Sequence, residues 1–252
     1  MGRRVMTTWS SDFELEPGEW FGEWLYKEIA ANVHIEQHGF MPDRVRTVAE
    51  RLQQDRPVGE RYVGVVPWLD AFNAFTAPGT YLYFGRRLLE RCPHEDAVAF
   101  VLAHEIAHHD LGHLELFAGR FTRHATRLTA AVLIVLFFRM LQKRIYSPEW
   151  ELAADRRAID LCLAAGYDPG KCIYLFHIME LIYLDYGDLK AVYGLDPESD
   201  QELSAEASLT TKARIWLYQR ERGYLPVQDR LAELQRYMAA EHGLEKVRPR
   251  RA

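Results

Sequence analysis

Side chains that could do chemistry are concentrated in one short apolar stretch, VLAHEIAHHDLGH, at residues 101–113. His104 and His108 are four positions apart, so on a helix both project from the same face, one turn apart. This spacing lets two imidazoles bind one tetrahedral zinc ion, and Glu105 beside them can accept a proton from zinc-bound water. The alternative is a chance HExxH motif with two core histidines, and the rest of the chain must decide between the two interpretations.

The neighbouring polar residues are poorer candidates for the third ligand. His113 lies nine positions after His104, about 180° round an unbroken helix, so we predict that it faces away from the zinc. His109 lies about 100° from the ligand face, and Glu115 lies on that face but about 10 Å further along the axis. We therefore expect His109 and His113 to be polar or second-layer residues, and the third ligand to come from another element.

A second helix that could complete the site is predicted in SPEWELAADRRAIDLCLAAGYDP. Ser147 is a good N-cap, Pro148 suits the first helical position, and Gly166 closes the C-terminal end. Glu151 and Asp155 are one turn apart, so one carboxylate can bind zinc while the other accepts the free ring N–H of a zinc-bound histidine. Taken alone, an ordinary solvated acid pair is the better interpretation, but beside an HExxH helix a metal site is favoured.

Upstream, short runs of aromatic and β-branched residues predict one small sheet. These runs are RYVGVVPW, AFNAFTA and TYLYFG, and Pro78-Gly79 between the last two is typical of a hairpin turn. Before them, the apolar spacing predicts a helix that begins near Trp20 and ends at Gly39, and a short helix after Pro42.

The pattern as a whole predicts an α+β fold that is mostly helical, with one small mixed or antiparallel sheet. After Gly85 almost every segment is helical, and the last two helices begin near Thr211 and Pro226. We divide the chain into a flexible N-terminal lead-in, a single folded domain and a frayed basic tail, at residues 1–18, 19–245 and 246–252.

The composition indicates which kinds of partner the protein binds and in which cellular compartment it works. The net charge is −5 and the basic residues are scattered, which argues against nucleic acid as a partner. The three cysteines, Cys92, Cys162 and Cys172, form no CxxC pair, so we expect reduced core thiols in a cytoplasmic protein. No apolar secretory segment follows the basic N-terminus. The oligomeric state has no signature in the sequence.

One apolar run, Ala130 to Phe138, raises the question of membrane contact. A transmembrane helix needs about 20 apolar residues, and this unbroken run is much shorter. We therefore predict a buried helix that supports the site. Basic residues flank the run on both sides and suit lipid headgroups, so peripheral contact in the plane of a membrane is the alternative.

The motifs together resemble a known family. HEIAHHDLGH followed by ELAAD and AGYDP, with NAFTAPGTYLYFGRRLLE upstream, is similar to the HtpX-like zinc metallopeptidases, the gluzincin family that also contains the CAAX prenyl protease. The resemblance runs from about Tyr62 to Ile215 and implies a zincin-type metallopeptidase domain with one zinc ion per chain. It implies that the three zinc ligands are His104, His108 and Glu151. It also implies that Glu105 is the general base and that Asp155 supports a ligand without binding the metal.

The chain departs from the family pattern at one motif. Family members usually carry His-Pro-x-Thr-x-x-Arg-Ile, and here the segment reads SLTTKARI, so Ser208 replaces the histidine while Arg214 is retained. In place of the histidine, we expect Arg214 to supply most of the charge on the substrate-oxygen side, with Tyr193 as another candidate. Losing an oxyanion donor costs on the order of 100-fold in rate, so we expect a slow peptidase.

We therefore predict a zinc endopeptidase that hydrolyses extended or unfolded polypeptides, with protein quality control as the implied setting. The strand Tyr81–Phe84 is predicted as the sheet edge that pairs with substrate backbone. The alternative is a zinc-stabilised protein-binding or chaperone-like module with weak or no proteolysis. Glu105 favours the first hypothesis and Ser208 the second.

Overall fold

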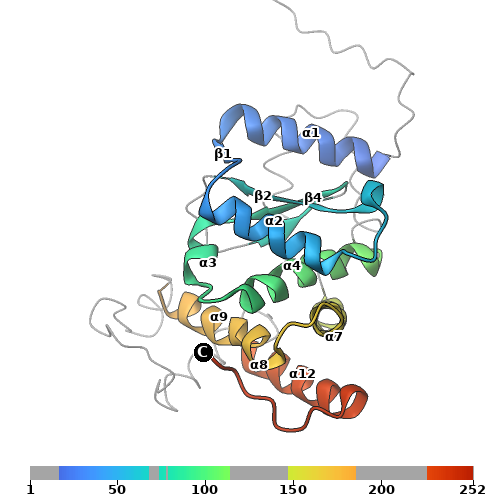
Figure 1. The fold of residues 1–252 in the computed structure, drawn as a ribbon, viewed down its shortest axis with the longest axis vertical. Helices are drawn as coiled ribbons and strands as arrows, with labels where there is room; N and C mark the ends of the chain where they lie inside the picture. Colours follow the sequence, from blue (N-terminus) through green and yellow to red (C-terminus); the bar gives the residue numbers. More distant parts are fainter. Residues whose placement is uncertain (1–16, 68–73, 78, 114–146, 186–225, 252) are drawn as a thin grey trace, which may run out of the picture.

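The computed structural model describes residues 17–67, 74–77, 79–113, 147–185 and 226–251 (Figure 1). Within these ranges the chain is mostly helical and carries one small sheet. The helices and strands, in chain order, are α1 (Pro17–Asn32), β1 (Ile35–Glu36), α2 (Phe40–Leu52), a 3-10 turn (Val58–Glu60), β2 (Val63–Pro67), β3 (Ala74–Thr76), β4 (Tyr81–Phe84), α3 (Arg86–Arg91), α4 (Glu95–Asp110), α7 (Pro148–Ala164), α8 (Pro169–Cys172), α9 (Tyr174–Asp185) and α12 (Val227–His242). The predicted α+β class is confirmed.

The sheet is mixed, with the strand order β1-β2-β4-β3. β3 and β4 pair antiparallel, as the predicted hairpin requires, whereas β2 and β4 run parallel, with Val63 opposite Tyr81. β4 therefore lies inside the sheet, and the prediction that Tyr81–Phe84 forms the edge is wrong. The parallel pairing with β2 moves β4 inward and leaves β3 as the edge strand on that side of the described sheet.

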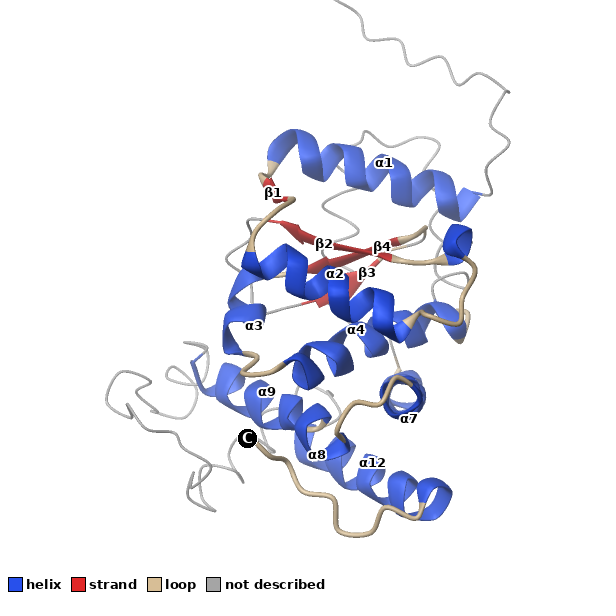
Figure 2. Cartoon of the chain, in the orientation of Figure 1, coloured by secondary structure: helices blue, strands red, loops and turns tan. Residues whose placement is uncertain are grey.

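Helices cover both faces of this sheet (Figure 2). Successive strand residues point to opposite faces. Val65, Phe75 and Tyr83 pack with Leu25 and Ile29 of α1 in one cluster of buried residues. The alternate residues belong to the main core with α2, α4 and α7, and they are Val66, Leu82 and Phe84. The sheet is therefore a middle layer, with α1 on one side and α2 and α4 on the other.

The site-bearing helix α4 is buried on nearly every side, so it lacks the polar stripe of a surface helix. It begins at Glu95. The ring Nδ1 of His94 accepts the backbone N–H of Ala97 at 3.2 Å, and this side-chain cap sets the first turn. α7 packs along α4, which brings the two helices of the candidate site together.

The predicted boundaries of α7 are confirmed. Ser147 Oγ accepts the backbone N–H of Trp150 at 3.3 Å, and Pro148 occupies the first helical position. At the other end Gly166 adopts φ +74°, and the chain turns there so that the N–H of Tyr167 reaches the carbonyl of Cys162 at 2.9 Å.

Two predictions near the chain ends are wrong. α1 ends at Asn32 rather than at Gly39, because strand β1 intervenes and Gly39 is instead the residue before α2. The basic tail is not frayed over its described part. The backbone N–H of Arg250 donates to the carbonyl of Gly170 at 2.9 Å, and the carbonyl of Val247 accepts a hydrogen bond from Gln235 at 2.7 Å.

Among the helices that the structure describes, none is both long enough and apolar enough to cross a bilayer. The apolar run Ala130 to Phe138 lies outside the described residues, so its predicted membrane contact stays a prediction. The helix expected near Thr211 also lies outside them, whereas the one expected near Pro226 is confirmed as α12.

Candidate metal centre

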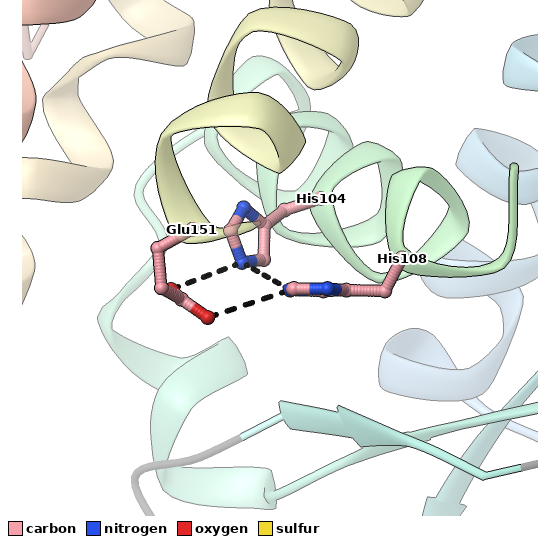
Figure 3. Close-up of side chains that lie close together, drawn as sticks. All are labelled: His104, His108 and Glu151. Atoms are coloured by element: carbon pink, nitrogen blue, oxygen red, sulfur yellow. Dashed lines mark hydrogen bonds and ion pairs between the residues drawn. The ribbon is translucent and has the colours of Figure 1, made fainter. Parts of the chain in front are cut away.

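Three side chains from two helices converge on one point (Figure 3). His104 and His108 project from adjacent turns of α4, and Glu151 reaches them from the first turn of α7. The Nε2 atoms of the two rings are 3.1 Å apart. The Glu151 carboxylate oxygens lie 3.6 Å from Nε2 of His104 and 3.5 Å from Nε2 of His108.

These separations fit a tetrahedral metal ion. Zinc bonds to imidazole nitrogen and carboxylate oxygen are about 2.0–2.1 Å long, so two ligand atoms of a tetrahedron lie about 3.3 Å apart. The distance between the two imidazole nitrogens is slightly shorter than this value, and the two distances to the Glu151 oxygens are slightly longer. Two imidazoles and one carboxylate are also the donor set of hydrolytic zinc sites, in which the fourth position is left for water.

The carboxylates of Glu151 and Asp155, one turn apart on α7, favour positive charge on the neighbouring His104. Asp155, one turn after Glu151, is buried and places Oδ1 3.0 Å from Nδ1 of His104. Burial by itself would lower the pKa of His104, but Asp155 and Glu151 outweigh it and raise that pKa to about 10. Burial dominates at His108 and lowers its pKa to about 4. The two carboxylates therefore stabilise positive charge at His104.

Arg230 is part of this cluster, and the sequence reasoning missed it. It lies in the first turn of α12, and its guanidinium binds both oxygens of Asp155 at 2.8 and 2.7 Å. Its Nη1 atom also lies 3.0 Å from Glu151. Burial would raise the pKa of each carboxyl group, but Arg230 and His104 hold both pKa values below their ordinary range. No local sequence signal marks Arg230, since its role depends on how α12 packs against α7.

His113 also differs from its prediction. It does not face away, because α4 ends at Asp110 and the chain reverses through Gly112, which adopts φ +69°. The buried ring of His113 then returns to His108, with 2.8 Å between the two Nδ1 atoms. The prediction assumed an unbroken helix, and Gly112 was the signal that could have corrected it, since glycine is common just after a helix end.

Glu105 and His109 both contact the edge strand β3. Glu105 is only 8% exposed, its carboxylate is hydrogen-bonded by the backbone of Thr76 in β3, and burial raises its pKa to about 7. The Thr76 hydroxyl is hydrogen-bonded to Nε2 of His109, whose ring stacks on Tyr62. His109 is therefore a bridge between α4 and the sheet, and its ring does not join the metal-binding group.

Several residues considered from the sequence lie outside the described residues. These are Glu115, Tyr193, Ser208 and Arg214. The structure thus brings His104, Glu105, His108, Glu151 and Asp155 into one cluster and leaves the expectations for Ser208 and Arg214 as predictions.

Comparison with known proteins agrees with this arrangement. No curated protein matches the chain. The model of peptidase family M48 matches residues 42–235, which is well over half of the chain and extends from α2 to α12. The matched segment includes α4, α7 and the first turns of α12, and so contains all the residues of the cluster. The chain therefore belongs to peptidase family M48 and is a metallopeptidase.

Proposed function

We propose that this metallopeptidase is a zinc-dependent endopeptidase that hydrolyses peptide bonds in extended or unfolded polypeptides. The observation that supports the proposal most strongly is the spacing of His104, His108 and Glu151, which matches the edges of a zinc tetrahedron beside a buried glutamate. One zinc ion per chain would be held by these three side chains. When bound, zinc polarises a substrate carbonyl and makes a water molecule acidic enough to lose a proton near neutral pH.

Glu105 is proposed as the general base. Glu105 directly follows the proposed ligand His104 on α4, and its carboxylate accepts a hydrogen bond from the Thr76 backbone. A general base works best when its pKa lies near the operating pH, and burial raises the pKa of Glu105 to about 7. Glu105 would take a proton from the attacking water and then deliver it to the amine of the leaving product.

The edge strand β3 replaces β4 as the proposed platform for substrate. β3 lies next to α4, and its outer side is not paired with another strand of the described sheet. An extended peptide can pair with such an edge through main-chain hydrogen bonds, which are largely independent of sequence. This mode of binding would suit unfolded polypeptides, and protein quality control is the proposed setting.

Two further roles rest on the sequence. Arg214 is proposed to supply positive charge to the substrate carbonyl oxygen, and Ser208, in place of the family histidine, is proposed to make turnover slow. A cytoplasmic location, with peripheral membrane contact through Ala130 to Phe138 as an option, is supported by three buried cysteines that are all free thiols.

Replacing Glu105 with glutamine separates the enzyme from its main alternative, a zinc-stabilised protein-binding or chaperone-like module. The amide cannot accept a proton, so Glu105→Gln should retain zinc and fold yet lose cleavage of a casein-like unstructured substrate by at least about 100-fold. The measurement is peptide release together with zinc content.

The matched control is Glu95→Gln, the same change at an exposed position of the same helix, which should cleave like the wild type. If the Glu105→Gln protein is as active as wild type, Glu105 has no part in the mechanism. If the wild type itself cleaves nothing while binding zinc, the binding-module hypothesis is favoured.

A further inference from the structure

We infer that His113 is a positioning residue that accepts the ring N–H of the metal ligand His108 and so fixes the tautomer in which His108 can bind metal. The inference rests on the proposed metal site and concerns a residue outside its ligand set. The two Nδ1 atoms are 2.8 Å apart, both rings are buried, and the contact lies on the side of His108 opposite Nε2.

Proton counting sets the direction of this hydrogen bond. Two imidazole nitrogens at hydrogen-bond distance share one proton, so one ring donates and the other accepts. If His108 accepted at Nδ1, its own proton would sit on Nε2 and occupy the lone pair that points at His104 and Glu151. Metal binding through Nε2 therefore requires His108 to donate from Nδ1 and the neutral His113 to accept.

The position of His113 is fixed from two directions. Gly112 turns the chain back after the end of α4, which brings the His113 ring under His108. The ring of His113 also stacks on Trp150, with ring centroids 4.5 Å apart and an interplanar angle of 4°. Because Trp150 directly precedes Glu151, this stack joins the end of α4 to the first turn of α7, and both carry ligands.

The two ligand histidines would thus have different partners. Nδ1 of His104 faces the carboxylate of Asp155, which Arg230 neutralises, whereas Nδ1 of His108 faces an uncharged imidazole. A ligand's ring N–H partner in zinc proteins is most often a carboxylate, a backbone carbonyl or water. A neutral acceptor orients His108 without adding a second negative charge behind the metal.

Two substitutions separate hydrogen bonding from packing. His113→Phe keeps a flat ring against Trp150 but has no acceptor, whereas His113→Asn loses the ring but places an amide oxygen near the position of Nδ1. Zinc affinity, measured by competition with a chelating dye, should fall about 10- to 100-fold in His113→Phe. The affinity of His113→Asn should be closer to that of wild type. His38→Phe, at an exposed histidine, serves as the control and should bind zinc like wild type.

Nuclear magnetic resonance tests the same bond without a mutation. In zinc-loaded wild type labelled with nitrogen-15 histidine, the two Nδ1 atoms should show a scalar coupling through the shared proton. That proton should be attached to His108. Absence of the coupling, or a proton attached to His113, would contradict the inference even where a variant fails to fold.

The affinity results have distinct readings. Unchanged affinity in His113→Phe would overturn the inference, and equal losses in the two variants would show that His113 acts only by packing. If the His108→Ala variant still binds one full equivalent of zinc, the proposed metal site is wrong, and the inference fails together with it.

Discussion

At the scale of single residues, the site is defined by which nitrogen or oxygen of each side chain faces the shared point. Both rings present Nε2 to it, and each Nδ1 is held from behind, by Asp155 for His104 and by His113 for His108. Glu151 offers one oxygen to each ring, and Arg230 holds the Glu151 carboxylate at 3.0 Å. The orientation of the three proposed ligands is therefore set by Asp155, His113 and Arg230, which lie outside the proposed ligand set.

The residue-scale prediction is loss of zinc on removal of one ligand. His108→Ala leaves two donors, which are too few to hold zinc at the stoichiometry of a three-ligand site, so zinc content should fall from one equivalent to well below one. His38→Ala, an exposed histidine outside the cluster, is the control and should keep one equivalent. Metal analysis after gel filtration decides, and a full equivalent in the His108→Ala protein would rule out this ligand set.

At the scale of elements, three segments distant in sequence must pack together before the site exists. α4 supplies the two proposed ligand histidines and Glu105, α7 supplies Glu151 and Asp155, and α12 contributes Arg230 to those two acids. The guanidinium of Arg230 also lies over the ring of Phe176 in α9. α12 is thus tied to α7 by a largely buried ion pair and to α9 by the contact of Arg230 with Phe176.

Removing Arg230 should weaken this packing. Arg230→Met leaves the buried Asp155 carboxylate without its guanidinium, and breaking one side of a buried ion pair costs about 3–5 kcal/mol. Chelator-treated protein should therefore unfold at lower urea concentration than wild type.

Arg236→Met, on the same helix, removes an exposed pair with Glu233 and should cost less than about 1 kcal/mol. Equal stability of the Arg230→Met and Arg236→Met variants would show that the Arg230 pair does not hold α12 in place.

A feature could be predicted from the sequence when the residues that determine it lie close together along the chain. The ends of α7 are set by Ser147, Pro148 and Gly166 within a few residues of where they act, so they could be read locally. The role of Arg230 and the inward position of β4 depend on contacts across the fold, so no local pattern reports them. The reversal at Gly112 lies between these cases, because the signal is local but was outweighed by the helical pattern around it.

At the scale of the whole molecule, the C-terminal segment after α12 packs against α8 and the start of α4. After α12 the chain returns to α8 and the start of α4, where the carbonyl of Arg250 lies 3.3 Å from Nε2 of His94. Asp168 anchors this return: its Oδ1 caps α8 by accepting the N–H of Lys171 at 3.0 Å, and its Oδ2 binds the Arg250 guanidinium. The tail thus helps to hold α8 beside α4.

This anchor gives a pH-dependent stability. Burial would raise the pKa of Asp168, but Arg250 and the backbone N–H groups outweigh it and lower that pKa. The carboxylate therefore stabilises the fold above the unfolded-state pKa of about 3.9, and the contribution is lost as pH falls through the lower folded-state pKa. Asp168→Ala should cost about 1–2 kcal/mol at pH 7 and less near pH 3, as measured by urea unfolding.

Asp55→Ala, an exposed aspartate elsewhere, is the comparison and should change little at either pH. A destabilisation by Asp168→Ala that does not diminish on acidification would mean that the Asp168 charge is not what anchors the tail.

In the proposed site, two imidazoles and one carboxylate hold a single zinc ion with a position open to water. X-ray absorption at the zinc edge, recorded on the purified protein with one equivalent of zinc, reports this coordination directly. We expect about four nitrogen or oxygen neighbours near 2.0–2.1 Å, the outer-shell signature of two imidazoles, and no sulfur. A shell of sulfur near 2.3 Å, the signature of only one imidazole, or six oxygen neighbours would contradict it.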